Sequence, residues 1–293
     1  MILEYQQPLY RPPSEGNNLI IQATLGCSFN QCSFCSMYRS KAYMARPVDE
    51  VIQDIKQAAS KWPDAHRVFL ADGDALNLAT DHLLEILKAL QQAFPKLARV
   101  SCYATPANIL HKTQSELSQL REQKLSLLYL GIESGNNSIL KKITKGASQK
   151  GMLKALSKTD QCDMKVSATV ILGLGGQNHW QQHIDGTVDL LNQAPVSYLS
   201  TLQLYLEPQQ QAEFMEKFGN DYVPSNDSQI LQELESLVAG FEPPKAIIFR
   251  SNHASNALAL AGNLSRDKDK LLLQIHQAQS GDRPLRADYL RGL

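Results

Sequence analysis

The sequence has 293 residues, of which 43% are hydrophobic and 20% are charged, so the chain can bury a core and is not intrinsically disordered. The chain has 29 lysine and arginine residues and 29 aspartate and glutamate residues. This balance argues against a protein that binds nucleic acid through a general excess of basic residues. No apolar run approaches the roughly 20 residues of a membrane-spanning helix, and the polar segment 1–17 is unlike a signal peptide, so we expect a cytoplasmic protein without a membrane partner.

The predicted elements alternate between short apolar runs and amphipathic stretches. A first strand is expected at 18–24, followed by a helix with Pro47 at its first position. Further strands are expected at 68–70, 99–103, 127–130, 166–172, 198–206 and 246–249. Helices are expected between and after them: one capped by Thr80, one at 106–123, segments from Asn136 and Ser148, one through 180–191, one from Asn226 and a last one at 268–279.

Strands that alternate with helices are typical of crossover units and a parallel sheet. Six or seven such units in under 300 residues fit a complete or partial barrel, and a doubly wound open sheet is the alternative. In either fold, ligands bind at the carboxyl ends of the strands. The loops that follow the strands are therefore the places where functional residues are expected.

Five cysteines are present, and three of them, Cys27, Cys32 and Cys35, lie within nine residues on the loop after the first strand. An odd number of cysteines in a reducing compartment makes a disulfide framework a poor explanation. Thiolates at C-x4-C-x2-C spacing on one loop can converge on a single soft metal centre. The loop is therefore the strongest functional signal in the sequence.

Two kinds of metal centre fit this spacing. An all-protein zinc site needs a fourth ligand, which Cys102, Cys162 or a histidine would have to supply from far along the chain. A [4Fe–4S] cluster with one iron left open for an exogenous ligand needs only three thiolates. The cluster is favoured, with a structural zinc loop or three reduced buried thiols as alternatives.

The cysteine loop resembles that of the radical S-adenosylmethionine (radical SAM) superfamily, whose usual spacing is C-x3-C-x2-C with an aromatic residue before the last cysteine. Phe34 fills that aromatic position, and the first spacing is one residue wider than usual. The second predicted strand ends in Asp72-Gly73-Asp74, where the superfamily has a Gly-Gly-Glu-like segment that binds the methionine amine of SAM. An ordinary polar turn is the alternative reading of this segment.

Two further strand ends are similar to the same superfamily. The fourth strand ends in Gly-Ile-Glu-Ser-Gly, so the resemblance gives Glu133 and Ser134 a place in the SAM site, with Glu133 as an acceptor for ribose hydroxyls or the amine. The fifth strand ends in a glycine-rich turn, where Ile171 would pack on adenine and Gly173 would let the backbone approach a ligand. The resemblance spans about residues 18–206.

The resemblance implies a partial (β/α)6 barrel of parallel strands over residues 18–206, with 1–17 as an N-terminal extension. Residues 207–293 would form a C-terminal βα extension that closes the barrel on the substrate side. Cys27, Cys32 and Cys35 would hold the [4Fe–4S] cluster, and an electron donor such as flavodoxin or ferredoxin would reduce it. SAM would then be cleaved to a 5′-deoxyadenosyl radical that acts on a substrate the sequence does not identify.

Two other functions stay open at this point. One is a zinc- or iron–sulfur-binding protein without SAM chemistry, which would have no use for Asp74 and Glu133. The other is an RNA-modifying enzyme, whose only support is a local basic run of four lysines over 141–150. Such a run is more typical of a solvated helical face, so nucleic acid is not the expected partner.

The segment 250–256 after the last predicted strand is the expected substrate side. Arg250 offers a rigid donor fork for a carboxylate or phosphate, and His253 can donate, accept or shuttle a proton. An Asn/Ser-rich turn that caps the following helix is the alternative. The remaining cysteines are expected to be inert core thiols, and His66, His82, His111, His183 and His276 are expected to be solvated or capping residues on helices.

Overall fold

The computed structural model of the chain describes residues 3–291. Its strands are β1 (Leu19–Gln22), β2 (Thr24–Leu25), β3 (Met44–Ala45), β4 (Arg67–Ala71), β5 (Arg99–Ala104), β6 (Leu125–Glu133), β7 (Lys165–Leu172), β8 (Tyr198–Gln203), β9 (Ile247–Ser251) and β10 (Leu260–Leu264). Eight of them form one sheet in the order β1-β4-β5-β6-β7-β8-β9-β10, and β2 and β3 form a separate antiparallel ribbon.

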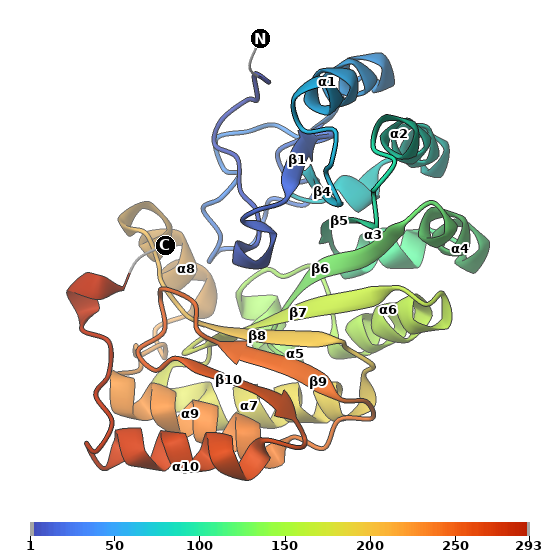
Figure 1. Cartoon of the computed structure of the whole chain (residues 1–293). Coiled ribbons are helices and arrows are strands. Elements are labelled where there is room, and N and C mark those ends of the chain that lie inside the picture. The colour runs from blue at the N-terminus through green and yellow to red at the C-terminus, as the bar shows by residue number, and fades with distance from the viewer. Residues whose placement is uncertain (1–2, 292–293) are drawn as a thin grey trace. The chain divides into compact units, whose positions relative to one another are not determined.

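Helices connect the strands along the chain (Figure 1). They are α1 (Val48–Lys61), α2 (Thr80–Ala93), α3 (Pro106–His111), α4 (Gln114–Glu122), α5 (Asn137–Lys142), α6 (Gln149–Gln161), α7 (Gly176–Gln193), α8 (Pro208–Phe218), α9 (Asp227–Gly240) and α10 (Lys268–Gln279), with 3-10 turns at Pro13–Glu15, Ala75–Asn77 and Asp288–Leu290. The pairs β1–β4, β4–β5, β5–β6, β7–β8 and β8–β9 are parallel, and β9–β10 is antiparallel. The predicted class, parallel strands alternating with helices, is confirmed.

The chain packs into two compact units. The first holds the chain up to Asn30 together with Cys35–Leu130 and Lys158–Val166. The second holds Gln31–Phe34, Gly131–Ser157 and the chain from Ser167 onward. The units cut across the segments 1–17, 18–206 and 207–293 expected from the sequence, because β6 and β7 each pass from one unit to the other. The division by chain order stays a prediction.

In the first unit, apolar side chains at helical spacing fasten the helices to the strands. The helix α1 buries Val51, Ile55 and Ala58 and packs against α2. Phe69 on β4 is fully buried, and its ring meets that of Tyr103 on β5 edge to face, with centroids 5.1 Å apart. This packing holds β4 and β5 in register, so that the loops after these two strands begin at the same edge of the sheet.

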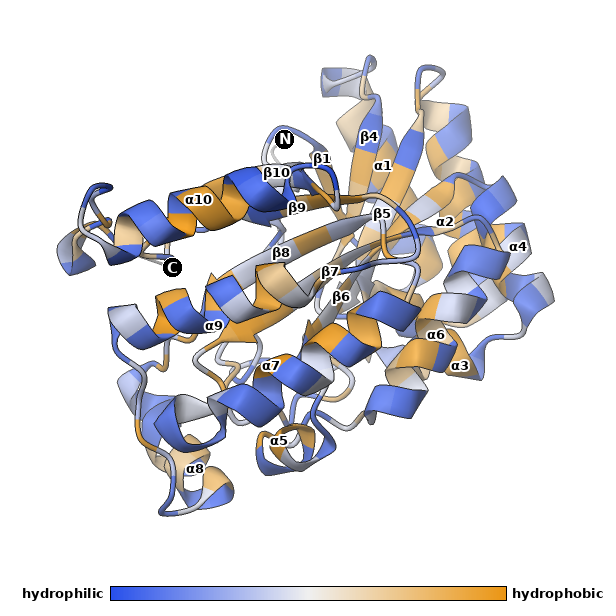
Figure 2. Ribbon diagram, turned by 90° about the horizontal axis from the view of Figure 1, so that it is seen from below, coloured by the Kyte–Doolittle hydropathy of each residue, from blue (hydrophilic) through white to orange (hydrophobic). Residues whose placement is uncertain are grey.

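In the second unit, α9 packs between α7 and α10. Each of these helices carries apolar and polar faces, seen as orange and blue stripes in Figure 2. The helix α9 alone buries Ile230, Leu231, Leu234, Leu237 and Val238. This C-terminal part has two elements that periodicity did not predict, α8 and β10. The strand β10 contains Gly262 and Asn263, which are poor strand formers and obscure its pattern.

Three local predictions were wrong. Pro47 is the N-cap residue before α1 and not the first residue of that helix. The helix expected at 106–123 is divided into α3 and α4, because Thr113 and Glu116 form a capping box. In that box, Thr113 Oγ1 accepts a hydrogen bond from Glu116 N at 3.2 Å, and Glu116 Oε2 accepts one from Thr113 N at 2.7 Å. Thr80 is the first residue of α2 and does not cap it, because its hydroxyl donates to Glu116 Oε1 at 2.7 Å.

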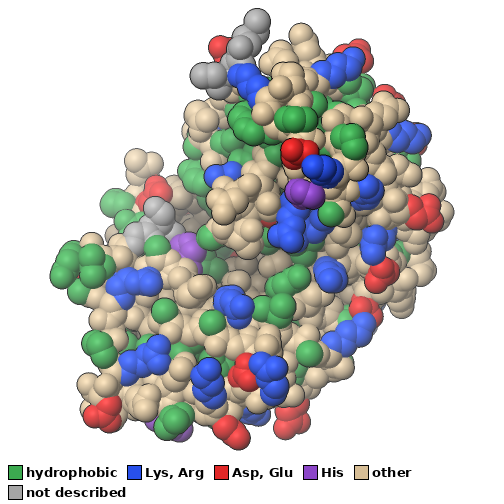
Figure 3. Space-filling view, viewed as in Figure 1, with side chains coloured by type: hydrophobic (Ala, Val, Ile, Leu, Met, Phe, Trp, Pro, Cys, Tyr) green, Lys and Arg blue, Asp and Glu red, His purple; other side chains and the backbone are tan. Residues whose placement is uncertain are grey.

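Acidic and basic side chains are interspersed over the face shown in Figure 3, as the balanced composition suggests.

Within residues 3–291, no helix combines the length and the apolar character that a bilayer crossing requires.

Candidate functional site

The cysteine loop leaves the sheet after β1 and is closed at its base by the β2–β3 ribbon. Cys27, Cys32 and Cys35 are partly exposed, and none of the five cysteines, all of which lie in the described range, forms a disulfide. Burial raises the pKa of Cys102 to about 12, so this thiol stays protonated, as expected for a core residue. The partly exposed thiols are on the loop, where a soft metal centre was predicted.

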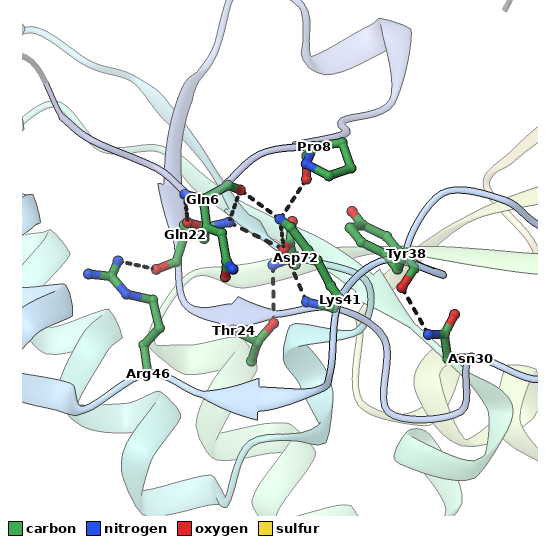
Figure 4. Close-up of polar contacts among 10 residues, drawn as sticks. Gln6, Pro8, Gln22, Thr24, Asn30, Tyr38, Lys41, Arg46 and Asp72 are labelled. Carbon is green, nitrogen blue, oxygen red and sulfur yellow. Dashed lines mark hydrogen bonds and ion pairs between the residues drawn. The ribbon is translucent and has the colours of Figure 1, made fainter.

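Asp72, directly after β4, holds the start of the cysteine loop (Figure 4). Its Oδ2 atom accepts hydrogen bonds from Gly26 N at 3.1 Å and Gln22 Nε2 at 3.2 Å. The backbone N–H of Asp72 in turn donates to Thr24 Oγ1 at 3.1 Å. A fully buried carboxylate needs such donors, so Asp72 is tied to the residues that lead into Cys27.

Lys41, at the other end of the cysteine loop, forms a buried ion pair with Asp72 (Figure 4). The Nζ–Oδ2 distance is 2.9 Å, and the two side chains are 2% and 0% exposed. The ammonium group also donates to the carbonyl oxygens of Gln6 and Pro8, each at 2.6 Å. Lys41 therefore links the N-terminal segment to the same carboxylate that holds Gly26.

Asp74 holds the residue on the other side of Cys27. Its Oδ1 accepts a hydrogen bond from Ser28 N at 2.8 Å, and its Oδ2 accepts from the Ser28 hydroxyl and from Asn108 Nδ2, the latter at 3.3 Å. Burial raises the pKa of Asp74, and the hydrogen bonds from Ser28 and Asn108 oppose that rise. The two acids after β4 thus fix the backbone on both sides of the first cysteine.

Gly73, between these acids, allows a close approach of the two loops. Its N–H donates to Gly26 O at 3.0 Å. A Cβ atom at this position would lie 2.8 Å from both Cys27 Cβ and Gly26 O, which is too close for any side chain. Glycine is therefore required here by packing against the cysteine loop.

In the second unit, Glu133 and Lys145 form an ion pair after β6. Lys145 Nζ lies 2.8 Å from Glu133 Oε1 and 6.0 Å from the centre of the Phe34 ring. The two charged side chains are 9% and 12% exposed. A Cβ atom on Gly131 would lie 1.8 Å from Glu133 Oε1, so the absence of a side chain at residue 131 makes room for the pair.

Ser134 and Ile171, predicted from two different strand ends, meet the same side chain. His183 of α7 has its Nδ1 2.8 Å from Ser134 Oγ and its Nε2 2.9 Å from Ile171 O. Ser134 and His183 are fully buried, and burial lowers the pKa of His183 to about 4. The expectation of a solvated or capping role for His183 was wrong.

Gly173 has both of its backbone polar groups engaged by the C-terminal part of the chain. Its N–H donates to Glu233 Oε2 at 2.7 Å, and its carbonyl accepts from Tyr222 OH at 3.1 Å. Its φ of +81° is a conformation that favours glycine. Burial raises the pKa of Glu233 to about 7, against the lowering effect of the Gly173 hydrogen bond.

Arg250 and His253 lie at the end of β9 and in the turn after it. Arg250 is exposed, and its Nη1 donates to the carbonyl oxygens of Phe249 at 2.7 Å and Gly262 at 3.4 Å. His253 is partly buried, and its Nδ1 accepts from Ser255 N at 3.2 Å. Burial, followed by the positive charge of Arg286, lowers the pKa of His253. The segment leads into β10 and not into a helix, so the helix-cap alternative was wrong.

The structure thus brings the predicted residues together in two groups. In the first unit, Asp72, Gly73 and Asp74 surround Cys27. In the second unit, Phe34 lies near the ion pair of Glu133 and Lys145. Ser134 and Ile171 both contact His183. Gly173 is held separately, by Glu233 and Tyr222. Within residues 3–291, no three His, Cys, Asp or Glu side chains are arranged as a metal site, so the ligand set stays a prediction from the sequence.

Several residues of these groups were not predicted. Lys145 was assigned to a solvated face, His183 was expected to be a solvated or capping residue, and Lys41 and Glu233 were not singled out. Their partners lie 12 to 60 positions away along the chain, and no local spacing encodes such a pairing. A buried charge or imidazole is recognisable only once its burial is known.

Comparisons with known proteins match the chain to one family over more than half of its length. The family model described as Radical SAM superfamily matches residues 21–191. The chain is 26% identical over 198 residues to a tRNA-2-methylthio-N(6)-dimethylallyladenosine synthase of Idiomarina loihiensis, covering 62% of this chain and 39% of that protein. It is 21% identical over 184 residues to the heme chaperone HemW of Bacillus subtilis, covering 60% of this chain and 48% of that protein.

A solved structure shares the fold. The coproporphyrinogen III oxidase HemN of Escherichia coli, described as a radical SAM enzyme, superimposes with a TM-score of 0.56 and 15% identity over 76% of this chain and 52% of that chain. This likeness supports the predicted partial-barrel class. The chain spans less than half the length of the curated relatives named above.

Proposed function

The chain belongs to the radical SAM superfamily, whose members are enzymes that bind a [4Fe–4S] cluster and SAM, and we propose that this chain reductively cleaves SAM to act on a substrate. The observation that carries the proposal is the C-x4-C-x2-C loop, whose first cysteine is fixed on both sides by the acids that follow β4. When bound, the reduced cluster and SAM supply a 5′-deoxyadenosyl radical that abstracts hydrogen from the substrate.

We assign the cluster to Cys27, Cys32 and Cys35. The three thiols are partly exposed on an irregular loop, which fits a soft metal centre with one position left for SAM. Asp72 and Lys41 anchor the loop at both ends, and Asp74 anchors Ser28. The role of these residues is to hold the loop in place before the cluster binds.

We assign SAM binding to Phe34, Asp72, Gly73, Asp74, Glu133, Ser134, Ile171 and Gly173. The Glu133–Lys145 pair offers one acceptor and one donor beside Phe34, and SAM carries both an ammonium and a carboxylate. Ile171 is 9% exposed and is suited to pack on a flat ring. Asp72, Asp74 and Ser134 are fully buried, so their part in SAM binding is indirect.

The substrate side is assigned to the C-terminal segment 207–293, with Arg250 and His253 as the residues that meet substrate. Arg250 is exposed on β9 and presents a planar donor group. Burial lowers the pKa of His253, which favours the neutral ring, and a neutral imidazole has one acceptor nitrogen. An external electron donor such as flavodoxin or ferredoxin, and a cytoplasmic location, complete the proposal.

A small molecule is the proposed substrate class. In the basic run over 141–150, Lys142 Nζ donates to Phe218 O and lies 3.3 Å from Asp221, and Lys145 pairs with Glu133. Of the lysines in this run, only Lys141 and Lys150 are exposed. A nucleic-acid surface needs basic groups that can reach phosphates. The tRNA-modifying relative makes RNA the alternative that a substrate screen must include.

The test is anaerobic reconstitution followed by metal and product analysis. We expect about four iron and four sulfide per chain, lost on changing Cys27, Cys32 or Cys35 to Ala. With dithionite and SAM, the protein should release 5′-deoxyadenosine slowly even without substrate. One zinc per chain with no iron signal after anaerobic purification would overturn the proposal.

Two acid variants separate the cluster loop from the SAM side. Asp74→Ala removes the acceptor for Ser28 and Asn108, so it should lower iron content. Glu133→Ala removes the partner of Lys145 and none of the hydrogen bonds that hold Gly26 and Ser28, so it should weaken SAM binding at normal iron content. Equal effects of both variants on iron would contradict these assignments.

A further inference from the structure

A buried chain of hydrogen bonds joins the ends of β6 and β7. His183 of α7 is 0% exposed, and its two ring nitrogens lie 2.8 Å from Ser134 Oγ and 2.9 Å from Ile171 O. Ser134 Oγ also accepts from Asn136 N at 3.1 Å. One imidazole therefore holds the residue after β6 and the residue near the end of β7.

The chemistry of these partners determines the position of each proton in this chain of hydrogen bonds. A backbone carbonyl only accepts, so His183 Nε2 must carry the hydrogen that it donates to Ile171 O. Neutral imidazole then has a lone pair on Nδ1, which accepts the hydroxyl proton of Ser134. The Ser134 proton is thereby committed to His183, and none remains for a ligand.

The helix α7 is tied to the same turn by a second set of contacts. Thr187 Oγ1 donates to His183 O and accepts from Gly135 N at 2.9 Å. A Cβ atom on Gly135 would lie 2.0 Å from Gly186 O, so helix and turn are in direct backbone contact. The turn itself is tight, because Ser134 N donates to Ile132 O at 2.8 Å and Glu133 has φ of +63°.

We propose that His183 is a positioning residue for SAM binding. Through its hydrogen bonds to Ser134 and Ile171, His183 holds the Glu133 turn and the end of β7 in the geometry that binds SAM. The inference rests on the proposed function, since Glu133 and Ile171 are its assigned SAM contacts. Ser134 takes part through the proton that it donates to His183. The imidazole sets the relative placement of the two strand ends without touching the ligand.

The experiment measures SAM affinity by calorimetry on the anaerobically reconstituted full chain. His183→Leu leaves the Ser134 hydroxyl and the Ile171 carbonyl unpaired, and we expect SAM affinity to fall about tenfold or more at normal iron content. His183→Gln can donate to Ile171 and accept from Ser134, so it should recover affinity to within about threefold of wild type. Ser134→Ala, a milder change, should weaken binding severalfold.

A control on the same helix separates positioning from general stability. Leu190→Ala creates a cavity at a fully buried site of α7 and should lower the urea midpoint while SAM affinity stays at the wild-type value. Wild-type affinity in both His183→Leu and Ser134→Ala would overturn the inference, as would an equal loss of affinity in Leu190→Ala. Reconstituted wild-type protein that holds iron but binds no SAM would instead overturn the proposed function.

Discussion

Replacing Glu233 by Gln should make the protein more stable at pH 8 and have little effect at pH 5. Glu233 on α9 is fully buried, and its Oε2 accepts a hydrogen bond from Gly173 N at 2.7 Å. Burial raises its pKa from 4.5 to about 7, so the folded protein carries this charge only at a cost. The carboxamide of Gln keeps an oxygen for the Gly173 N–H and never ionises.

The magnitude follows from the two pKa values. They differ by about 2.5 pH units, and at about 1.36 kcal/mol per unit the ionised side chain costs the fold about 3 kcal/mol. Because the pKa in the folded state is the higher one, the folded protein binds more protons between pH 4.5 and 7. The contribution of Glu233 to the free energy of unfolding is therefore greatest below pH 4.5 and declines as the pH rises to 7.

The assay is urea unfolding of wild type and Glu233→Gln at pH 5 and pH 8. His183 has a folded pKa lowered to about 4, so its contribution rises with pH over nearly the same range. This opposite contribution is common to both proteins and cancels when they are compared at one pH. The difference in unfolding free energy between variant and wild type should be larger at pH 8 by about 3 kcal/mol.

Glu235→Gln on the same helix is the matched control. Glu235 is partly exposed, and hydrogen bonds from Gln279 and His276 lower its pKa. Its replacement should not produce a stability gain that grows toward pH 8. A Glu233→Gln effect that is the same at both pH values would refute the reasoning, because it would mean that Glu233 ionises in the folded protein as it does in the unfolded chain.

Three further substitutions test the other polar contacts. Lys41→Met leaves the buried Asp72 carboxylate unpaired and should lower the urea unfolding free energy by about 3–5 kcal/mol; a loss under 1 kcal/mol would contradict this. Gly131→Ala should weaken SAM binding at normal iron content, since its Cβ would collide with Glu133; unchanged affinity would show that the pair can move. Arg291→Ala breaks a bidentate ion pair with α9 and should speed proteolysis near the C-terminus, measured by mass spectrometry, without changing iron content.

The strands and most helices were predictable because their signals are local. Runs such as 68–70 and 166–172 are apolar and flanked by turn residues, and they are found as β4 and β7. The break between α3 and α4 also has a local signal in the sequence, because Thr113 is followed three residues later by Glu116. It was missed because apolar residues continue across it at helical spacing.

The site was predictable only where chemistry is tied to fixed spacing. Cys27, Cys32 and Cys35 carry their own signal, since thiols at this spacing on one loop can converge on a soft metal centre. Lys145 carries none, because its importance depends on Glu133, twelve positions earlier, turning back toward it after β6. Lys41 and His183 are likewise defined by burial against distant partners.

The acids that follow the strands differ in how much of each carboxylate the protein already uses. Asp74 has both oxygens engaged by Ser28 and Asn108, and Asp72 Oδ2 accepts three donors from the chain. Glu133 pairs with Lys145 through Oε1 and is not fully buried. A ligand amine that bound Asp74 would have to displace existing hydrogen bonds, whereas Glu133 can add one. Because a lost buried hydrogen bond costs about 1–3 kcal/mol, Asp74 is better suited to hold the cysteine loop, and Glu133 is better suited to meet SAM.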